Sequence, residues 1–188
     1  MTTSTDIANQ AIQLIGNNQP PVTGAAPNFD DSPAGKALKY LYAPTIATVA
    51  RSYEWDFARS TIALTLTGNV APLGWAYEYL YPTNGIEVWQ IMPATIVDPN
   101  DPLPLNFAVG NAVVSGQQQR VILSNVPNAR AVYNNNPTED SWDSTFRESV
   151  VRLLADGLAI ALAGKPDLAM AMLEQSGGFS SLGQSRQG

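Results

Sequence analysis

The order of hydrophobic patterns along the 188 residues limits the fold more than any other feature of the sequence. Apolar residues recur at helical spacing in residues 4–58 and again in 139–175. Between these zones, residues 60–134 show the alternation and the turn residues that are typical of strands. Because the helical zones flank the β-type zone, we predict an α+β fold, a helical bundle from the N- and C-terminal helices with an inserted antiparallel β-rich region. The length predicts a single domain over 1–175, with 176–188 as a flexible tail.

Capping residues and one proline indicate where the helices begin and bend. Ser4 or Thr5 is expected to cap the first helix, and Asp140 or Ser141 the long helix near the C-terminus. Pro44 interrupts the apolar stripe of the second helix. Since its ring removes one backbone donor and clashes with the preceding turn, we predict a kink or a break there.

The middle of the chain carries strand signals separated by turns. Residues 61–67 alternate between apolar side chains and threonine, which predicts a half-buried strand. The pair Asn84 and Gly85 stands between two strand-like segments, 75–81 and 86–92, and predicts a hairpin. Residues 93–118 hold several prolines and little periodicity, so we expect a long loop there.

The composition excludes several kinds of active site. The chain has no histidine and no cysteine, so it can form neither a Ser-His-Asp triad, a thiol nucleophile, a disulfide nor a zinc–thiolate site. Ten basic and sixteen acidic residues give a net charge of −6, which argues against a surface that grips nucleic acid phosphates. No phosphate-binding or calcium-binding loop is complete, and we predict no cofactor, no metal and no catalytic site.

No membrane or export segment is expected. The longest apolar stretch, residues 150–163, is too short to cross a bilayer and contains Arg152 and Asp156. The first ten residues lack the basic and apolar regions of a signal peptide. The sequence therefore predicts a protein that is made and folded in a cytoplasm.

One strand is rich in aromatic residues. Tyr77, Tyr79 and Tyr81 share one face beside Trp75. We expect this face to be packed against the terminal helices, while contact with another chain and stacking of sugars remain alternatives.

Several segments carry a resemblance to a known family when taken in order from Asp6 to Leu173. They are Ala8–Gly16; Asp31-Ser32 through Ala37 to Tyr40-Leu41-Tyr42; Trp55–Arg59; Trp75-Ala76-Tyr77 with Tyr81-Pro82; and Phe146 with Leu153-Leu154-Ala155. This set resembles the phage tail tubular protein A family, the head-to-tail adaptors of short-tailed bacteriophages.

The resemblance implies a structural virion protein rather than an enzyme. It implies a homo-oligomeric ring of twelve copies between the portal protein and the tail nozzle or tail tube protein. Genome DNA would pass through the ring without specific binding, and the protein would lie in the neck of the virion after assembly in the host cytoplasm. The family's C-terminal segment reaches the portal, which makes Phe179, Leu182 and Arg186 the expected portal contacts.

Two other functions stay open from the residues themselves. A tail-associated enzyme that degrades peptidoglycan would need a carboxylate pair, with Glu54 or Glu139 as the acid. A carbohydrate-binding tail accessory would use an aromatic set, namely Trp75, Tyr77, Tyr79 and Trp89.

Overall fold

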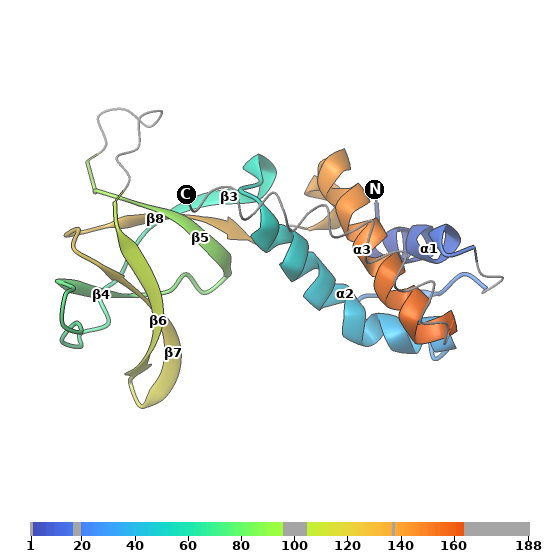
Figure 1. The fold of residues 1–188 in the computed structure, drawn as a ribbon, viewed down its shortest axis with the longest axis horizontal. Coiled ribbons are helices and arrows are strands. Elements are labelled where there is room, and N and C mark those ends of the chain that lie inside the picture. Colours follow the sequence, from blue (N-terminus) through green and yellow to red (C-terminus); the bar gives the residue numbers. More distant parts are fainter. Residues whose placement is uncertain (1, 17–19, 96–104, 137, 164–188) are drawn as a thin grey trace. The chain divides into compact units, whose positions relative to one another are not determined.

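The computed structural model describes residues 2–16, 20–95, 105–136 and 138–163, and they form two compact units (Figure 1). The terminal unit combines both ends of the chain, residues 1–53 and 137–188, and the central unit spans 54–136. Residues 176–188, predicted as a flexible tail, lie outside the described residues, and the single domain predicted for 1–175 stays a prediction.

The predicted fold class is wrong. Within the described ranges the chain forms three α-helices and eight strands, and the strands build three antiparallel sheets. Strands take up 30% of the described residues and helices 38%, so the β structure is not an insertion into a helical bundle. One sheet even lies inside the terminal unit, because residues predicted as a loop form the short hairpin of β1 (Gly24–Ala25) and β2 (Asn28–Phe29).

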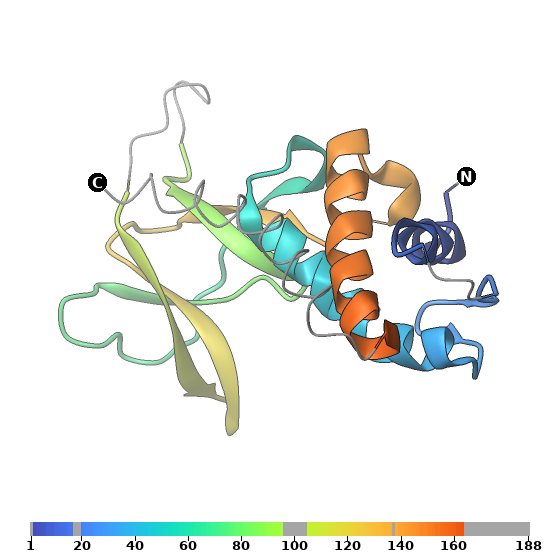
Figure 2. The same cartoon turned by 45° about the vertical axis from the view of Figure 1, so that its right-hand side comes forward.

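The terminal unit is built on three helices. They are α1 (Ser4–Leu14), α2 (Pro33–Ser52) and α3 (Ser144–Ala163), and both α1 and α2 pack against α3 (Figure 2). Their apolar faces meet in a dry core in which the largest side chains are Ile7, Leu38, Phe146, Val150, Leu154 and Leu158.

The helix starts differ from the sequence prediction by a few residues. Thr3 caps α1, since its hydroxyl accepts from the Asp6 amide and the Asp6 carboxylate accepts from the Thr3 amide. Asp143 rather than Asp140 or Ser141 caps α3, and its carboxylate accepts from the Phe146 amide at 2.7 Å. In each case the residue just outside the first turn is the one whose side chain reaches the free amides.

Of the kink or break predicted at Pro44, the break is absent, because α2 continues through this residue from Pro33 to Ser52. Pro44 lies on the exposed face of the helix. The packed residues on the opposite face, among them Tyr42, Ile46 and Val49, hold both halves of α2 in the core. Burial of that face therefore outweighs the one backbone hydrogen bond that proline cannot make.

The central unit holds two three-stranded antiparallel sheets. The first has the order β3 (Arg59–Ala63), β8 (Arg130–Asn135), β5 (Gly85–Met92), and the second the order β4 (Tyr77–Leu80), β7 (Gln117–Ser124), β6 (Phe107–Val114). The hairpin predicted at Asn84 and Gly85 is wrong, since β4 pairs with β7 and β5 pairs with β8. The loop predicted over 93–118 is also wrong, because it includes all of β6 and the start of β7.

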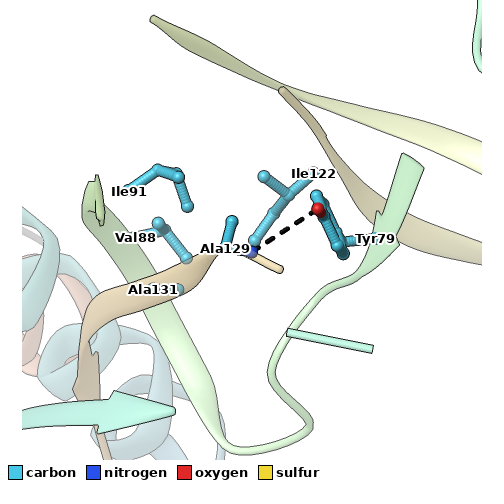
Figure 3. Close-up of a cluster of buried hydrophobic side chains, with 6 residues drawn as sticks. All are labelled: Tyr79, Val88, Ile91, Ile122, Ala129 and Ala131. Atoms are coloured by element: carbon cyan, nitrogen blue, oxygen red, sulfur yellow. Dashed lines mark hydrogen bonds between the residues drawn. The ribbon is translucent and has the colours of Figure 1, made fainter. Parts of the chain in front are cut away.

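The core of the central unit takes side chains from both sheets (Figure 3). Tyr79 of β4 is buried, and its hydroxyl donates to the Val126 carbonyl at 2.6 Å. Tyr77 and Tyr81 pack at the edge of the same cluster. The other buried members of the cluster are Val88, Ile91, Ile122, Ala129 and Ala131. The aromatic face of β4 is thus packed on residues of the sheets, not on the terminal helices as the sequence suggested.

Candidate interaction surface

The predicted portal-contacting residues Phe179, Leu182 and Arg186 all lie outside the described residues. The described residues include the two candidate carboxylates, the aromatic residues predicted to bind sugars and the exposed surface of each unit.

The two carboxylates named as candidate acids each have a partner. Glu139 precedes α3 and accepts a hydrogen bond of 3.0 Å from the Tyr42 hydroxyl. Burial is the main cause that raises the pKa of Tyr42 far above its ordinary value, and the Glu139 charge adds to it. Glu54 forms an ion pair with Arg59, with 3.4 Å between Oε1 and Nε. Glu139 belongs to the terminal unit and Glu54 to the central unit.

The aromatic residues proposed to bind sugars do not share an exposed platform. Tyr79 lies in the core, and the Tyr77 ring packs on it with 6.0 Å between the ring centroids. Trp75 and Trp89 are half-buried. Since stacking on a sugar needs an open ring face, Tyr79 cannot take part in it.

The described ranges contain neither a metal-binding cluster nor a membrane-spanning helix. No group of three acidic side chains converges there as metal ligands would. None of the helices described is both long enough and apolar enough to cross a bilayer.

The most exposed large apolar side chains occur together on a loop of the central unit, residues 68–74, which we call the apolar loop. The solvent accessibilities of Val70 and Leu73, relative to a free residue, are 95% and 105%, so both side chains are fully exposed. The loop begins at Gly68 and ends at Gly74, which both have positive φ, 84° and 95°. Glycine adopts this backbone conformation without strain, so the two glycines allow the chain to turn out and return.

Polar side chains hold the base of the apolar loop, and one of them, Glu78, is buried. The buried Glu78 carboxylate accepts hydrogen bonds from the Thr67 hydroxyl and from the side-chain amide of Asn69, both at 2.8 Å. On the other side, the Asn125 side chain accepts from the Ala76 amide at 2.7 Å and donates to the Gly74 carbonyl. The loop is therefore fixed at both ends while its two apolar side chains face water.

Two further exposed apolar side chains, Leu66 and Val113, lie next to the apolar loop. Asn69 also donates to the Val113 carbonyl at 3.1 Å, which places the end of β6 beside the loop. Leu66, Val70, Leu73 and Val113 are all exposed, and we call these four residues the apolar end. Single exposed apolar residues are common on proteins, whereas several that lie together can mark a contact surface.

Sequence reasoning missed this surface. Its one sequence signal is the segment Val70-Ala71-Pro72-Leu73 between two glycines, a short apolar run without helical or strand period. Such a run predicts a turn, but only the structure shows that its side chains lie outside the core.

Comparisons with known proteins add no assignment to this geometry. No protein-family model matches the chain, and no curated protein is similar to it.

Proposed function

We propose that this protein is a structural virion protein, a head-to-tail adaptor that forms a ring between the portal and the tail of a bacteriophage. Such a ring would be a conduit for DNA ejection and a platform for tail assembly. The observation that carries the proposal is the apolar end, where a fixed loop presents Val70 and Leu73 to solvent. The ordered sequence features from Asp6 to Leu173 support the same family of adaptors.

A contact role fits the apolar end better than a catalytic one. It offers aliphatic side chains, and Glu78, the carboxylate at its base, is buried and holds the loop. Side chains of this kind bind by excluding water and supply no acid, base or nucleophile. The proposal therefore gives the protein no catalytic step and no cofactor.

The small size of the apolar end favours a many-copy assembly. A stable contact between two proteins buries about 800 Å² on each partner, more than the four aliphatic side chains of the apolar end supply. In a ring each copy repeats the same contact, and the linked contacts hold together more strongly than any one of them. A ring of twelve copies is the form that the family resemblance implies.

The charge of the chain suits passage of DNA rather than binding. Sixteen acidic residues against ten basic ones give a net charge of −6, which repels phosphates overall. A conduit that repels its cargo lets DNA move through without a specific site. Contact with the portal is assigned to the C-terminal residues Phe179, Leu182 and Arg186, with the assembled protein in the virion neck.

The test combines two variants of the full chain with purified portal and tail nozzle proteins. Removal of residues 176–188 should weaken the complex with the portal at least ten-fold. Replacement of Val70 and Leu73 by serine should weaken ring assembly without unfolding the protein, because both side chains are exposed. Leu14→Ser is the matched control, since Leu14 is an exposed aliphatic residue of the terminal unit. Unchanged assembly of both test variants would remove the support for this proposal.

A further inference from the structure

The outer edge of β6 carries no charge, bulge or proline, and the Val113 carbonyl at its end accepts a hydrogen bond from Asn69. All eight residues of β6 pair with β7 without a bulge, and none of them is charged or a proline. The other open strands differ, because β5 has two register shifts and β3 is short and carries Arg59. Proteins commonly protect edges with charges, bulges or proline, so an unprotected regular edge of this length is a surface prepared for another strand.

The backbone groups on this edge can be assigned from the turn. Ser115 and Gly116 form a two-residue turn with positive φ at both positions, closed by the pair Val114 and Gln117. Because antiparallel pairs alternate, the amide and carbonyl of Asn111 then point away from β7. The Arg120 carbonyl, opposite Asn111, accepts from the Tyr81 amide on the far side of β7, which agrees with this alternation.

The exposed residues along the edge are arranged symmetrically about Asn111. Val109 and Val113 lie two residues before and after it, and all three are exposed. The residues between them, Gly110 and Ala112, are both small. If two such edges meet antiparallel with Asn111 opposite Asn111, Val109 of each copy faces Val113 of the other. The side-chain amides of the two Asn111 residues can then bond to each other.

The charge around β6 permits two copies to approach here. The chain has a net charge of −6, yet no acidic residue occurs between Asp101 and Glu139. Within that segment the charged residues are Arg120 and Arg130. Glu78, which Asn69 links to the Val113 end of β6, is buried and hydrogen-bonded. Two copies that meet along β6 therefore avoid the repulsion that their exposed acidic residues would cause.

From the unprotected edge, the symmetric pattern and the missing acidic charge, we infer that β6 pairs antiparallel with β6 of a second copy, in the register centred on Asn111. The result is a continuous six-stranded sheet across a two-fold axis. The Val113 carbonyl already accepts a hydrogen bond from Asn69. A carbonyl oxygen has two lone pairs, so it can also accept from a backbone amide of the partner strand.

This dimer goes beyond the proposed adaptor function and does not depend on it. Copies in a ring between portal and tail all point the same way, whereas the copies of this dimer are related by a two-fold axis. The pairing is therefore a state of the free protein, in which each copy covers the β6 edge of the other.

The absence of cysteine allows a direct test of the register. In the full-length variant Asn111→Cys, the two thiols meet across the two-fold axis, where paired Cα atoms lie about 5.5 Å apart, within disulfide range. Mild oxidation should give a covalent dimer at least ten-fold faster than for Gln119→Cys, an exposed residue of the neighbouring strand β7. Equal rates for the two variants would overturn the proposed register.

A second measurement examines the edge itself by light scattering on the full chain at micromolar concentration. The unmodified protein and Asn111→Ala should elute as dimers. Asn111→Pro should elute as a folded monomer, because it removes an outward amide and leaves the bonds to β7 in place. A monomeric unmodified protein, or a folded Asn111→Pro variant that stays dimeric, would overturn the inference.

Discussion

The Tyr42 hydroxyl and the Glu139 carboxylate join α2 to the segment that leads into α3, across 97 residues of sequence, through a hydrogen bond of 3.0 Å. Tyr42 is buried, and its ring also packs edge-on against Phe29 with 5.5 Å between the centroids. This one side chain thus connects the β1–β2 hairpin, α2 and the start of α3. The first prediction concerns this connection.

Replacement of Tyr42 by phenylalanine should destabilise the terminal unit by about 1–2 kcal/mol, because Glu139 loses its donor while the ring packing is kept. The change should appear as a fall in the melting temperature measured by circular dichroism. Tyr40→Phe is the matched control, since Tyr40 is 81% exposed and lies on the same helix. An equal fall in both variants would show that the hydrogen bond to Glu139 contributes nothing.

Stability at acid pH should depend on Asp30. Hydrogen bonds from Ser32 and Thr23 lower the pKa of Asp30 to about 2. Because the folded pKa lies below the unfolded value of about 3.9, the stabilisation is present above pH 4 and is lost as the pH falls toward 2. Melting temperatures between pH 2 and 6 should therefore fall less steeply for Asp30→Asn than for the unmodified protein.

The control for this titration is Asp140→Asn, which removes an exposed carboxylate of the same unit. Its melting temperature should follow the same pH dependence as the unmodified protein. An Asp30→Asn variant with the unmodified slope would contradict the role assigned to the Asp30 hydrogen bonds.

Gly35 at the start of α2 should not tolerate a side chain. A Cβ atom there would lie 2.3 Å from the Asp30 carbonyl oxygen, which is backbone and cannot move aside cheaply. Gly35→Ala should therefore destabilise the protein by about 1–3 kcal/mol in urea denaturation. Gly110→Ala is the matched control, since the nearest atoms to its added Cβ lie at 3.9 Å. Equal midpoints for the two variants would refute this close approach.

The order of the apolar loop should depend on Glu78. Glu78→Ala removes the acceptor for Thr67 and Asn69, and amide exchange in residues 68–74 should rise at least ten-fold by mass spectrometry. Glu78→Gln keeps one acceptor oxygen and should raise exchange less. No difference between the alanine variant and the unmodified protein would mean that other contacts fix the loop.

The helices could be located from the sequence because their signal is local. The spacing of Phe146, Val150, Leu154 and Leu158 predicted α3, and these residues are buried on one face. The strand partners could not be predicted in the same way. Asn84 and Gly85 predicted that β4 pairs with β5, but the partner of β4 is β7, which begins 37 residues after β4 ends. Pairing over such distances depends on which faces fit in the core rather than on the turn between neighbours.

The base of the apolar loop could not be predicted from the sequence either. Asn69, Glu78 and Asn125 are separated in sequence, and none of them carries a motif. Only the arrangement of β4 and β7 brings them to the base of the apolar loop. The fold class failed for a related reason, since β1, β2 and β6 lie in segments whose glycines, asparagines and prolines predicted loops.

Native mass spectrometry of the full chain mixed with its portal protein tests the proposed adaptor function most directly. We expect a complex that holds many copies of the 20.1 kDa chain on one portal, twelve for the ring that the resemblance implies. A chain that stays monomeric or dimeric and binds no portal at micromolar concentration would contradict the adaptor function.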